Sequence, residues 1–179
     1  VGSEMCIRDR KYNMYIIFGM TEKDEAGKIT DNGVEKVYNS AAILYPNGRI
    51  DSYQKIHRAG QENKWSVTGK TPKIIETKWG KIGVDICRDG HFYPELGRYY
   101  AAMGCKMLIH PTATTGNAWY RSTRIGSYVD RDGMAAITCN LLGGDGIYVA
   151  DGAYTYSPDD IDENGDFVGG SAIPETFYN

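Results

Sequence analysis

Short runs of hydrophobic residues, separated by polar turns, predict a chain built mostly of buried β-strands. Pro46-Asn47-Gly48 predicts a tight turn between two of them, because Asn and Gly tolerate a positive φ. Residues 21–38 are polar and are expected to form a loop or a loose hairpin, and residues 151–166 an acidic loop. The predicted strands span residues 15–18, 41–45, 49–55, 74–75, 81–87, 107–111, 135–139 and 169–173.

Two segments have the residue spacing of helices. Pro94 suits the first turn of a helix, and Gly104 suits its end. Residues 119–132 predict a second helix. Strands that alternate with helices favour a layered α/β fold. The apolar positions of the first helix follow the order i, i+3, i+4 and i+7 at Leu96, Tyr99, Tyr100 and Met103.

Cys87 is the residue with the most suggestive surroundings. The strand at 81–87 alternates, so that Asp85 and Cys87 share one face. Cys87 then lies at a strand-to-helix turn, which presents a nucleophile to a cleft beside backbone N–H groups that can bind an oxyanion. A thiol nucleophile also needs a nearby cation or base, and Lys55, at the end of another predicted strand, can supply the cation. Taken alone, a cysteine at a strand end is more often a small buried hydrophobe.

Composition narrows the class of protein. The 179 residues suit one domain. Lys and Arg number 20 and Asp and Glu 23, a net charge of −3 that argues against sequence-independent nucleic-acid binding. Hydrophobic residues, at 41%, suffice for a core, and no apolar run is long enough to span a bilayer. The 4 cysteines form no CxxC or zinc pattern and no signal peptide is recognised, so we expect a reduced, cytoplasmic protein.

The first eleven residues differ from the rest of the sequence. The string VGSEMCIRDR has no periodicity and no turn chemistry, and it resembles a translated sequencing adaptor. We therefore predict that residues 1–11 are a non-native or disordered leader and that residues 12–179 form the domain. A frayed natural terminus is the alternative.

Several motifs together resemble those of the carbon–nitrogen hydrolase, or nitrilase, superfamily. Tyr53-Gln54-Lys55-Ile56-His57 is similar to the family's lysine motif. Gly83-Val84-Asp85-Ile86-Cys87-Arg88-Asp89, followed by Pro94-Glu95-Leu96, is similar to its cysteine motif. Further matches occur in the family's order at residues 38–41, 46–48, 108–113, 140 and 170–173.

This resemblance implies an incomplete α-β-β-α sandwich and a hydrolase that cleaves the C–N bond of an amide or nitrile. Cys87 would be the nucleophile that forms a thioester, and Lys55 would stabilise the tetrahedral intermediate. Ammonia or an amine would leave, and no metal or organic cofactor is required. Arg88, His91 and Trp119 are the predicted substrate-binding residues.

The family's general-base glutamate is implied before the strand at 15–18. Glu4 falls in the leader, while Glu22 and Glu25 lie in a predicted loop after that strand, so none is assigned. We therefore expect the central part of a longer enzyme, inactive by itself. Many members have a second glutamate between the lysine and the cysteine. Glu62 is the nearest candidate for that role, although a solvated loop carboxylate is the favoured interpretation.

Two metal-binding patterns have little support. Residues 160–167 resemble the start of an EF-hand, but position 12 of the loop is Ser171, so a solvated acidic turn is favoured. The remaining titratable residues are scattered, and no metal site is predicted among them. These residues are His57, His91, His110, Asp85 and Asp89.

Simpler structural roles are expected for several residues near the cysteine motif. Asp89 is expected to orient the turn after Cys87 by accepting backbone hydrogen bonds. His91 either lines the cleft or is a surface residue. Cys105 and Cys139 lie in predicted strands and are expected to be in the core.

Three alternatives to an amidase stay open. A nitrilase or an N-carbamoyl-amide hydrolase would use the same residues, and a non-catalytic interaction module of the same fold would lack the base. The expected partner is a small amide or nitrile, with no nucleic acid and no membrane. The resemblance also implies a homo-oligomer for the full-length protein, with Tyr99, Tyr100 and Met103 either at a two-fold interface or in the core.

Overall fold

The computed structural model describes residues 11–23, 30–31, 34–113, 128, 131–140, 145–149, 152–156 and 171–173. The chain forms two compact units, Val1–Lys73 and Ile74–Asn179. The predicted leader lies almost entirely outside the described residues. Within the described residues, no helix is long and apolar enough to cross a membrane.

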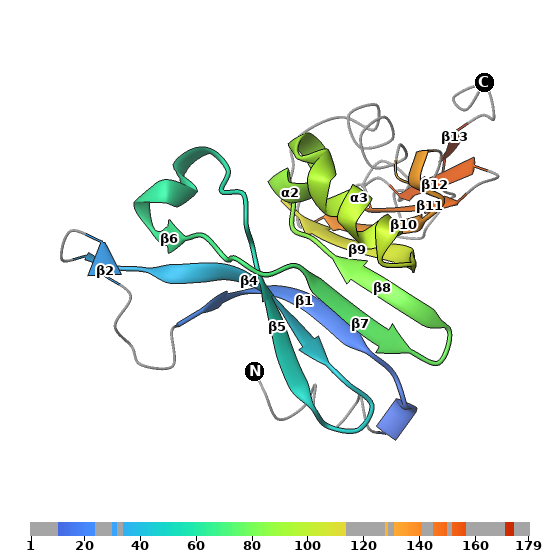
Figure 1. Ribbon diagram of the computed structural model, residues 1–179, viewed down its shortest axis with the longest axis horizontal. Helices are drawn as coiled ribbons and strands as arrows, with labels where there is room; N and C mark the ends of the chain where they lie inside the picture. Colours follow the sequence, from blue (N-terminus) through green and yellow to red (C-terminus); the bar gives the residue numbers. More distant parts are fainter. Residues whose placement is uncertain are drawn as a thin grey trace, which may run out of the picture. The chain divides into compact units, whose positions relative to one another are not determined.

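The first unit is built on an antiparallel sheet in which β4 is the central strand (Figure 1). β1 (Ile16–Glu22) and β5 (Ile50–Gln54) pair with β4 (Val37–Leu44) on either side. The short strand β6 (Ser66–Val67) pairs with β4 in parallel, and the 3₁₀ helix η1 (Gly60–Lys64) precedes it. The β4 residues Ser40 to Leu44 are buried, in agreement with the apolar strand predicted at residues 41–45.

The predicted turn between β4 and β5 is confirmed. Gly48 has a φ of +82°, and its N–H donates to the Tyr45 carbonyl at 2.9 Å. The expected loop at 21–38 is only partly right, because β1 extends to Glu22 and β4 begins at Val37. Between them, β2 (Thr30–Asp31) and β3 (Val34–Glu35) form a small antiparallel hairpin, in line with the loose hairpin expected there.

The second unit contains most of a mixed sheet with the strand order β13-β12-β11-β10-β9-β8-β7. β8 (Gly80–Val84), β9 (Cys105–Thr112) and β10 (Ala135–Asn140) are parallel. The later strands are antiparallel. The prediction of a loop from residue 151 is wrong where β12 forms, because β12 pairs with both of its neighbours despite the acidic composition of this segment. The other strands are β7 (Lys73–Thr77), β11 (Asp145–Val149), β12 (Gly152–Tyr156) and β13 (Ser171–Ile173).

Two helices connect β8 to β9. The predicted helix is α3 (Pro94–Ala102), which has Pro94 in its first turn. The five-residue helix α2 (Arg88–Phe92) before it was not predicted, because it is too short for apolar periodicity. Most of the helix predicted at 119–132 lies outside the described residues, although residues 128, 131 and 132 are helical.

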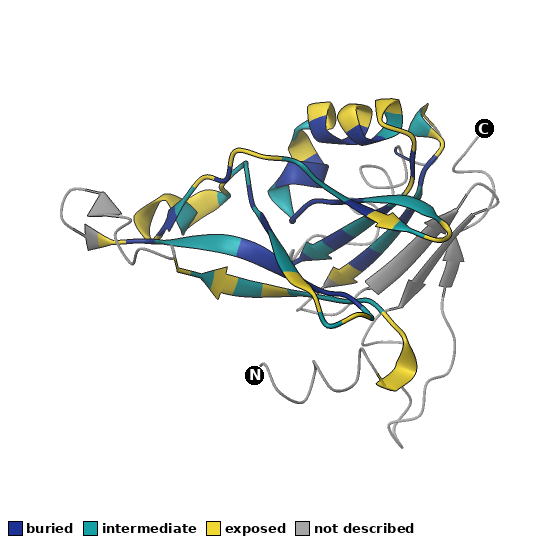
Figure 2. Cartoon of the chain, turned by 60° about the horizontal axis from the view of Figure 1, so that its bottom comes forward, coloured by how far each residue is buried: buried dark blue, intermediate teal, exposed yellow. Residues whose placement is uncertain are grey.

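Helix α3 packs one face against the sheet (Figure 2). The hydroxyl of Tyr100 donates to the Val84 carbonyl at 2.6 Å, and its ring lies so close to Gly83 that a Cβ there would be 2.6 Å from it. Tyr100 is therefore a core residue, which settles one of the alternatives left by the sequence. Tyr99 and Met103 are each 42% exposed.

Candidate active site

Lys55 lies directly after β5, with its side chain buried and 1% exposed. Its backbone N–H donates to the Asn39 carbonyl, and its own carbonyl accepts from the Gly69 N–H, both at 2.8 Å. A Cβ at Gly69 would lie 2.0 Å from the Gln54 carbonyl oxygen, so only glycine allows this close approach. The end of β5 is thus fixed from both sides.

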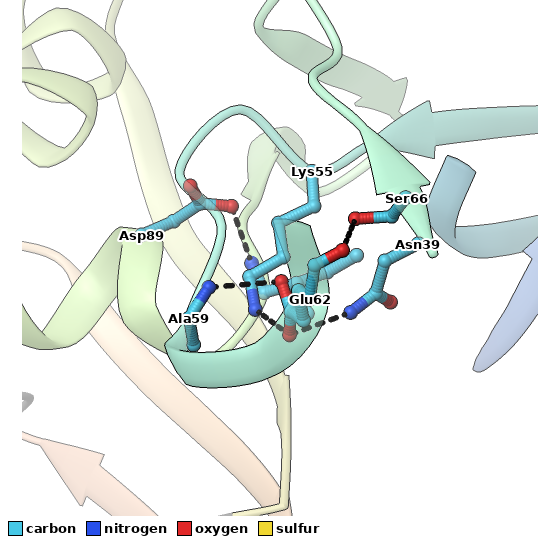
Figure 3. A network of polar contacts seen from close by, with 7 residues as sticks. Asn39, Lys55, Ala59, Glu62, Ser66 and Asp89 are labelled. Atoms are coloured by element: carbon cyan, nitrogen blue, oxygen red, sulfur yellow. Dashed lines mark hydrogen bonds and ion pairs between the residues drawn. The ribbon is translucent and has the colours of Figure 1, made fainter. Parts of the chain in front are cut away.

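Glu62 of η1 binds the ammonium group of Lys55 (Figure 3). The Nζ–Oε1 distance is 2.7 Å, and the same oxygen accepts from the Asn39 side chain at 3.2 Å. The second oxygen accepts from the Ala59 N–H at 3.0 Å, so that Glu62 also caps the start of η1. Together these bonds fix the direction of the Lys55 side chain.

The favoured sequence interpretation of Glu62 as a solvated loop carboxylate is therefore wrong. Its side chain is 15% exposed and accepts three hydrogen bonds. The sequence offered one signal for this role, because Glu62 lies close to Lys55 along the chain. A lysine whose ammonium group is taken out of water requires a carboxylate partner. The sequence could not reveal which of the nearby carboxylates would supply it.

Glu22 lies on the opposite face of the same sheet from Lys55. It ends β1, contrary to the predicted loop, and its carboxylate accepts from the hydroxyl of Ser40 at 2.6 Å and that of Ser52 at 3.1 Å. Ser40 pairs with Gln54, one residue before Lys55, and side chains alternate along a strand. Glu22 and Lys55 therefore project from opposite faces, and this excludes Glu22 as a partner of Lys55 within the unit.

Cys87 lies in the second unit, between the end of β8 and helix α2. It has a φ of +50° and a ψ of −105° and is one of two non-glycine residues with positive φ in the described part of the chain. Its N–H donates to the Pro111 carbonyl at 3.0 Å, and its carbonyl accepts from Gly90 and His91 at 3.1 Å each. The predicted strand-to-helix turn is thus present, with a strained backbone at the cysteine.

The backbone after Cys87 can act as a hydrogen-bond donor toward a reacting oxygen. The N–H of Arg88 is the first of helix α2 and therefore has no acceptor within the helix. The carboxylate of Asp89 accepts from the Ile86 N–H at 3.1 Å, and the Asp89 N–H donates to the Ile86 carbonyl at 3.1 Å. This pair of bonds closes the turn, as predicted for Asp89.

Asp85 and His110 form a buried pair beside the turn. Oδ1 of Asp85 lies 2.5 Å from Nδ1 of His110, and Nε2 of His110 lies 3.4 Å from Nε2 of His91. His91 is 4% exposed, so the surface alternative for it is wrong. The contact with His110 could not be predicted from the sequence, because it joins residues of β9 and α2.

Tyr128 forms a hydrogen bond with the backbone of helix α2. Its hydroxyl donates to the Gly90 carbonyl at 2.7 Å. Burial, followed by the charge of Asp85, raises the pKa of the Tyr128 phenol well above its usual range. The phenol thus stays protonated and keeps donating to α2 at neutral pH.

Other predicted residues have mixed outcomes. Arg88 is partly buried and stacks its guanidinium over the Phe92 ring, 4.8 Å from its centroid. Trp119 and the EF-hand-like segment 160–167 lie outside the described residues. Cys105 is buried as predicted, but Cys139, near the end of β10, is exposed, which corrects its assignment to the core. The described residues contain no group of three or more metal-ligating side chains.

Comparison with known proteins identifies the family. The model of the carbon-nitrogen hydrolase family matches residues 5–175. The chain belongs to the carbon–nitrogen hydrolase family. The chain is 31% identical over 134 residues to the omega-amidase NIT2 of Danio rerio, which covers 68% of this chain and 45% of the relative. With the omega-amidase NIT2 of Homo sapiens it shares 29% identity over 159 residues, covering 82% of this chain and 54% of the relative.

The chain thus spans about half the length of these curated carbon–nitrogen hydrolases. Among solved structures, a mutant amidase from Nesterenkonia sp. AN1 has a TM-score of 0.68 at 18% identity, covering 98% of this chain and 67% of that one. The family member Nit3 from Saccharomyces cerevisiae has a TM-score of 0.66 at 22% identity, covering 93% of this chain and 59% of that one. These similarities confirm the predicted fold class.

Proposed function

We propose that this chain carries the nucleophile and the oxyanion-binding groups of an amidase that hydrolyses small amides. The observation that carries the proposal is the Cys87 turn, in which a cysteine with positive φ precedes the first N–H of a helix. The second support is the buried lysine whose direction is fixed by Glu62. The name omega-amidase given to two relatives favours an amide over a nitrile.

In the proposed reaction, the sulfur of Cys87 attacks the carbonyl carbon of the amide. A C–S bond forms, and the carbonyl electron pair moves to the oxygen, where the Arg88 N–H stabilises the negative charge. The resemblance to the family's lysine motif implies that the Lys55 ammonium also stabilises this charge. The intermediate then collapses, the C–N bond breaks, and the nitrogen leaves as ammonia with the proton that the thiol lost. Water attacks the resulting thioester, which releases a carboxylic acid and restores the thiol.

The proton transfers require a general base, and the resemblance to the family implies a glutamate before β1 for this role. Glu62 has a different task in the proposal, because both of its oxygens are occupied as acceptors. It holds the Lys55 ammonium in one position, so that no reorganisation is needed as charge develops on the substrate oxygen. Glu62 is thus a positioning residue for Lys55.

A related structure contains a nucleophilic cysteine in its active site. One structure of a mutant Nesterenkonia amidase carries the acetamide moiety of fluoroacetamide on its active-site cysteine, and another mutant binds butyramide. These are properties of that enzyme. For the present chain we infer the same class of substrate, a short primary amide, with Arg88, His91 and Trp119 remaining predicted contacts of the substrate. A homo-oligomer and a cytoplasmic location also remain predictions.

Ammonia release tests the proposal. The full-length protein that contains this chain is assayed with short primary amides, the matching nitriles and N-carbamoyl compounds. We expect turnover of amides, and a loss of at least about 10³-fold in kcat for Cys87→Ala and about 10²-fold for Lys55→Met. Cys139→Ala is the matched control, because it removes an exposed thiol from β10. Preference for nitriles or carbamoyl compounds would reassign the substrate, and no turnover of any would favour the interaction module.

A further inference from the structure

A buried acid–histidine pair lies beside the nucleophile turn and has no role in the proposed chemistry. Asp85 continues the pairing of β8 with β9, because its N–H donates to the Ile109 carbonyl at 3.1 Å. This brings its carboxylate next to His110, one residue further along β9. Both side chains are 0% exposed. The pair is thus part of the wall on which α2 rests.

Hydrogen-bonding rules indicate where a proton of His110 lies. With Asp85 as a carboxylate, which only accepts, the 2.5 Å contact places a proton on Nδ1 of His110. The other nitrogen meets Nε2 of His91 at 3.4 Å, with the two rings nearly perpendicular at 87°. When one of these two nitrogens carries a proton, it can donate to the other. A continuous chain of polar contacts therefore runs from Asp85 through His110 to His91.

This series of polar contacts ends inside the turn that presents the nucleophile. His91 lies four residues after Cys87, and its N–H donates to the Cys87 carbonyl. The backbone of Gly90 rests directly on the pair, since a Cβ there would lie 2.6 Å from Oδ2 of Asp85 and 2.9 Å from the His110 ring. Tyr128 holds the Gly90 carbonyl from another direction. The Asp85–His110 pair is therefore in close contact with the first turn of α2.

We propose that Asp85 and His110 are positioning residues for the Cys87 turn. They hold the strained backbone at Cys87 and the N–H groups that follow it in the arrangement that thioester formation needs. This proposal rests on the proposed function for its kinetic consequences. Its structural content, a His110 whose Nδ1 proton is bound by Asp85, holds independently of the substrate.

Substitutions at His110 separate positioning from simple packing. His110→Phe keeps a ring but removes both polar contacts, and we expect kcat to fall about tenfold to hundredfold while KM changes less than about threefold. His110→Asn places an amide N–H near the position of Nδ1, and it should restore at least half of the lost kcat. The rate of Cys87 alkylation by iodoacetamide, followed by mass spectrometry of the peptide, should fall and recover in parallel.

Thr138 supplies the matched control. It is paired with His110 in the neighbouring strand β10 and is 1% exposed, and within the described residues its hydroxyl has no hydrogen-bond partner. Thr138→Val removes a buried hydroxyl beside His110 and keeps both polar contacts of His110, because these go to Asp85 and His91. We expect kcat and the alkylation rate to stay within about twofold of the wild-type values.

Nitrogen NMR of histidine-labelled full-length protein tests the pair without an activity assay. We expect a protonated Nδ1 for His110, assigned by its loss in His110→Asn, and a shift of that signal in Asp85→Asn. An unprotonated Nδ1, or an alkylation rate in His110→Phe equal to that of wild type, would overturn the proposal. If wild type hydrolyses none of the test compounds, the proposed function fails, while the NMR and alkylation results still decide the positioning role.

Discussion

The pair formed by Lys55 and Glu62 makes a quantitative prediction about stability. The Lys55 side chain is 1% exposed, and its ammonium lies 2.7 Å from the Glu62 carboxylate. Glu62→Ala leaves this ammonium buried without its carboxylate. Breaking a buried pair in this way costs about 3–5 kcal/mol of the free energy of unfolding, mainly because the remaining charge is uncompensated.

Two further variants divide this cost into its parts. Glu62→Gln keeps an oxygen that can accept from Lys55, but its amide nitrogen then faces the Ala59 N–H, which is also a donor. Because a neutral hydrogen bond is about half as strong as a charge-assisted one, we expect a loss of about 2 kcal/mol. Lys55→Met removes the buried charge itself. The double variant Lys55→Met/Glu62→Gln should therefore be more stable than the sum of the single losses implies.

Urea unfolding, followed by circular dichroism, measures these differences. With a slope of about 2 kcal/mol per molar urea, Glu62→Ala should lower the midpoint by about 1.5–2.5 M. The double-mutant cycle should give a coupling energy of at least about 1.5 kcal/mol. Additive effects, with a coupling below about 0.5 kcal/mol, would refute the argument that Glu62 compensates a buried ammonium.

Three other predictions concern backbone strain, close packing and pH. Cys87→Gly should be more stable than Cys87→Ala by about 1 kcal/mol in thermal unfolding although both are inactive, because only glycine relieves the φ of +50°; equal stability would contradict the strain. Gly90→Ala, whose Cβ would lie 2.6 Å from Asp85, should lower the rate of Cys87 alkylation at least about fivefold, and an unchanged rate would contradict the packing of α2 on the pair. Burial tends to raise the pKa of Asp51, but hydrogen bonds from Lys73 and Arg49 outweigh it and lower that pKa below 3.8. Wild type should therefore exceed Asp51→Asn in stability by at most about 1 kcal/mol near neutral pH, and this advantage should disappear as the pH falls below about 4. A stability difference that grows in acid would contradict a lowered pKa of Asp51.

Much of the fold follows from local patterns in the sequence. The turn at residues 46–48, helix α3 and strands β8 to β10 were predictable because turn residues and apolar periodicity are local signals. Helix α2 and strands β11 and β12 were not predicted. Helix α2 is too short to show a period, and the acidic composition after residue 150 masked the pairing of β12 with its neighbours.

The site was predictable in part. Cys87 and Lys55 stood out through strand ends and family motifs. The partners that fix them could not be found in this way, because Glu62 reaches Lys55 from a 3₁₀ helix and Asp85 reaches His110 across two strands. Such contacts depend on where tertiary packing places a charge, and a sequence pattern records only the residue types. The face of the sheet on which Glu22 lies likewise became clear only from the strand register.

Mass spectrometry of the full-length protein during turnover of a short primary amide tests the central claim most directly. We predict a transient acyl adduct whose mass equals the amide minus ammonia, located on the peptide that contains Cys87, and no adduct on Cys139. Release of ammonia without any adduct at Cys87, or with full activity in Cys87→Ala, would contradict a thioester mechanism at this cysteine.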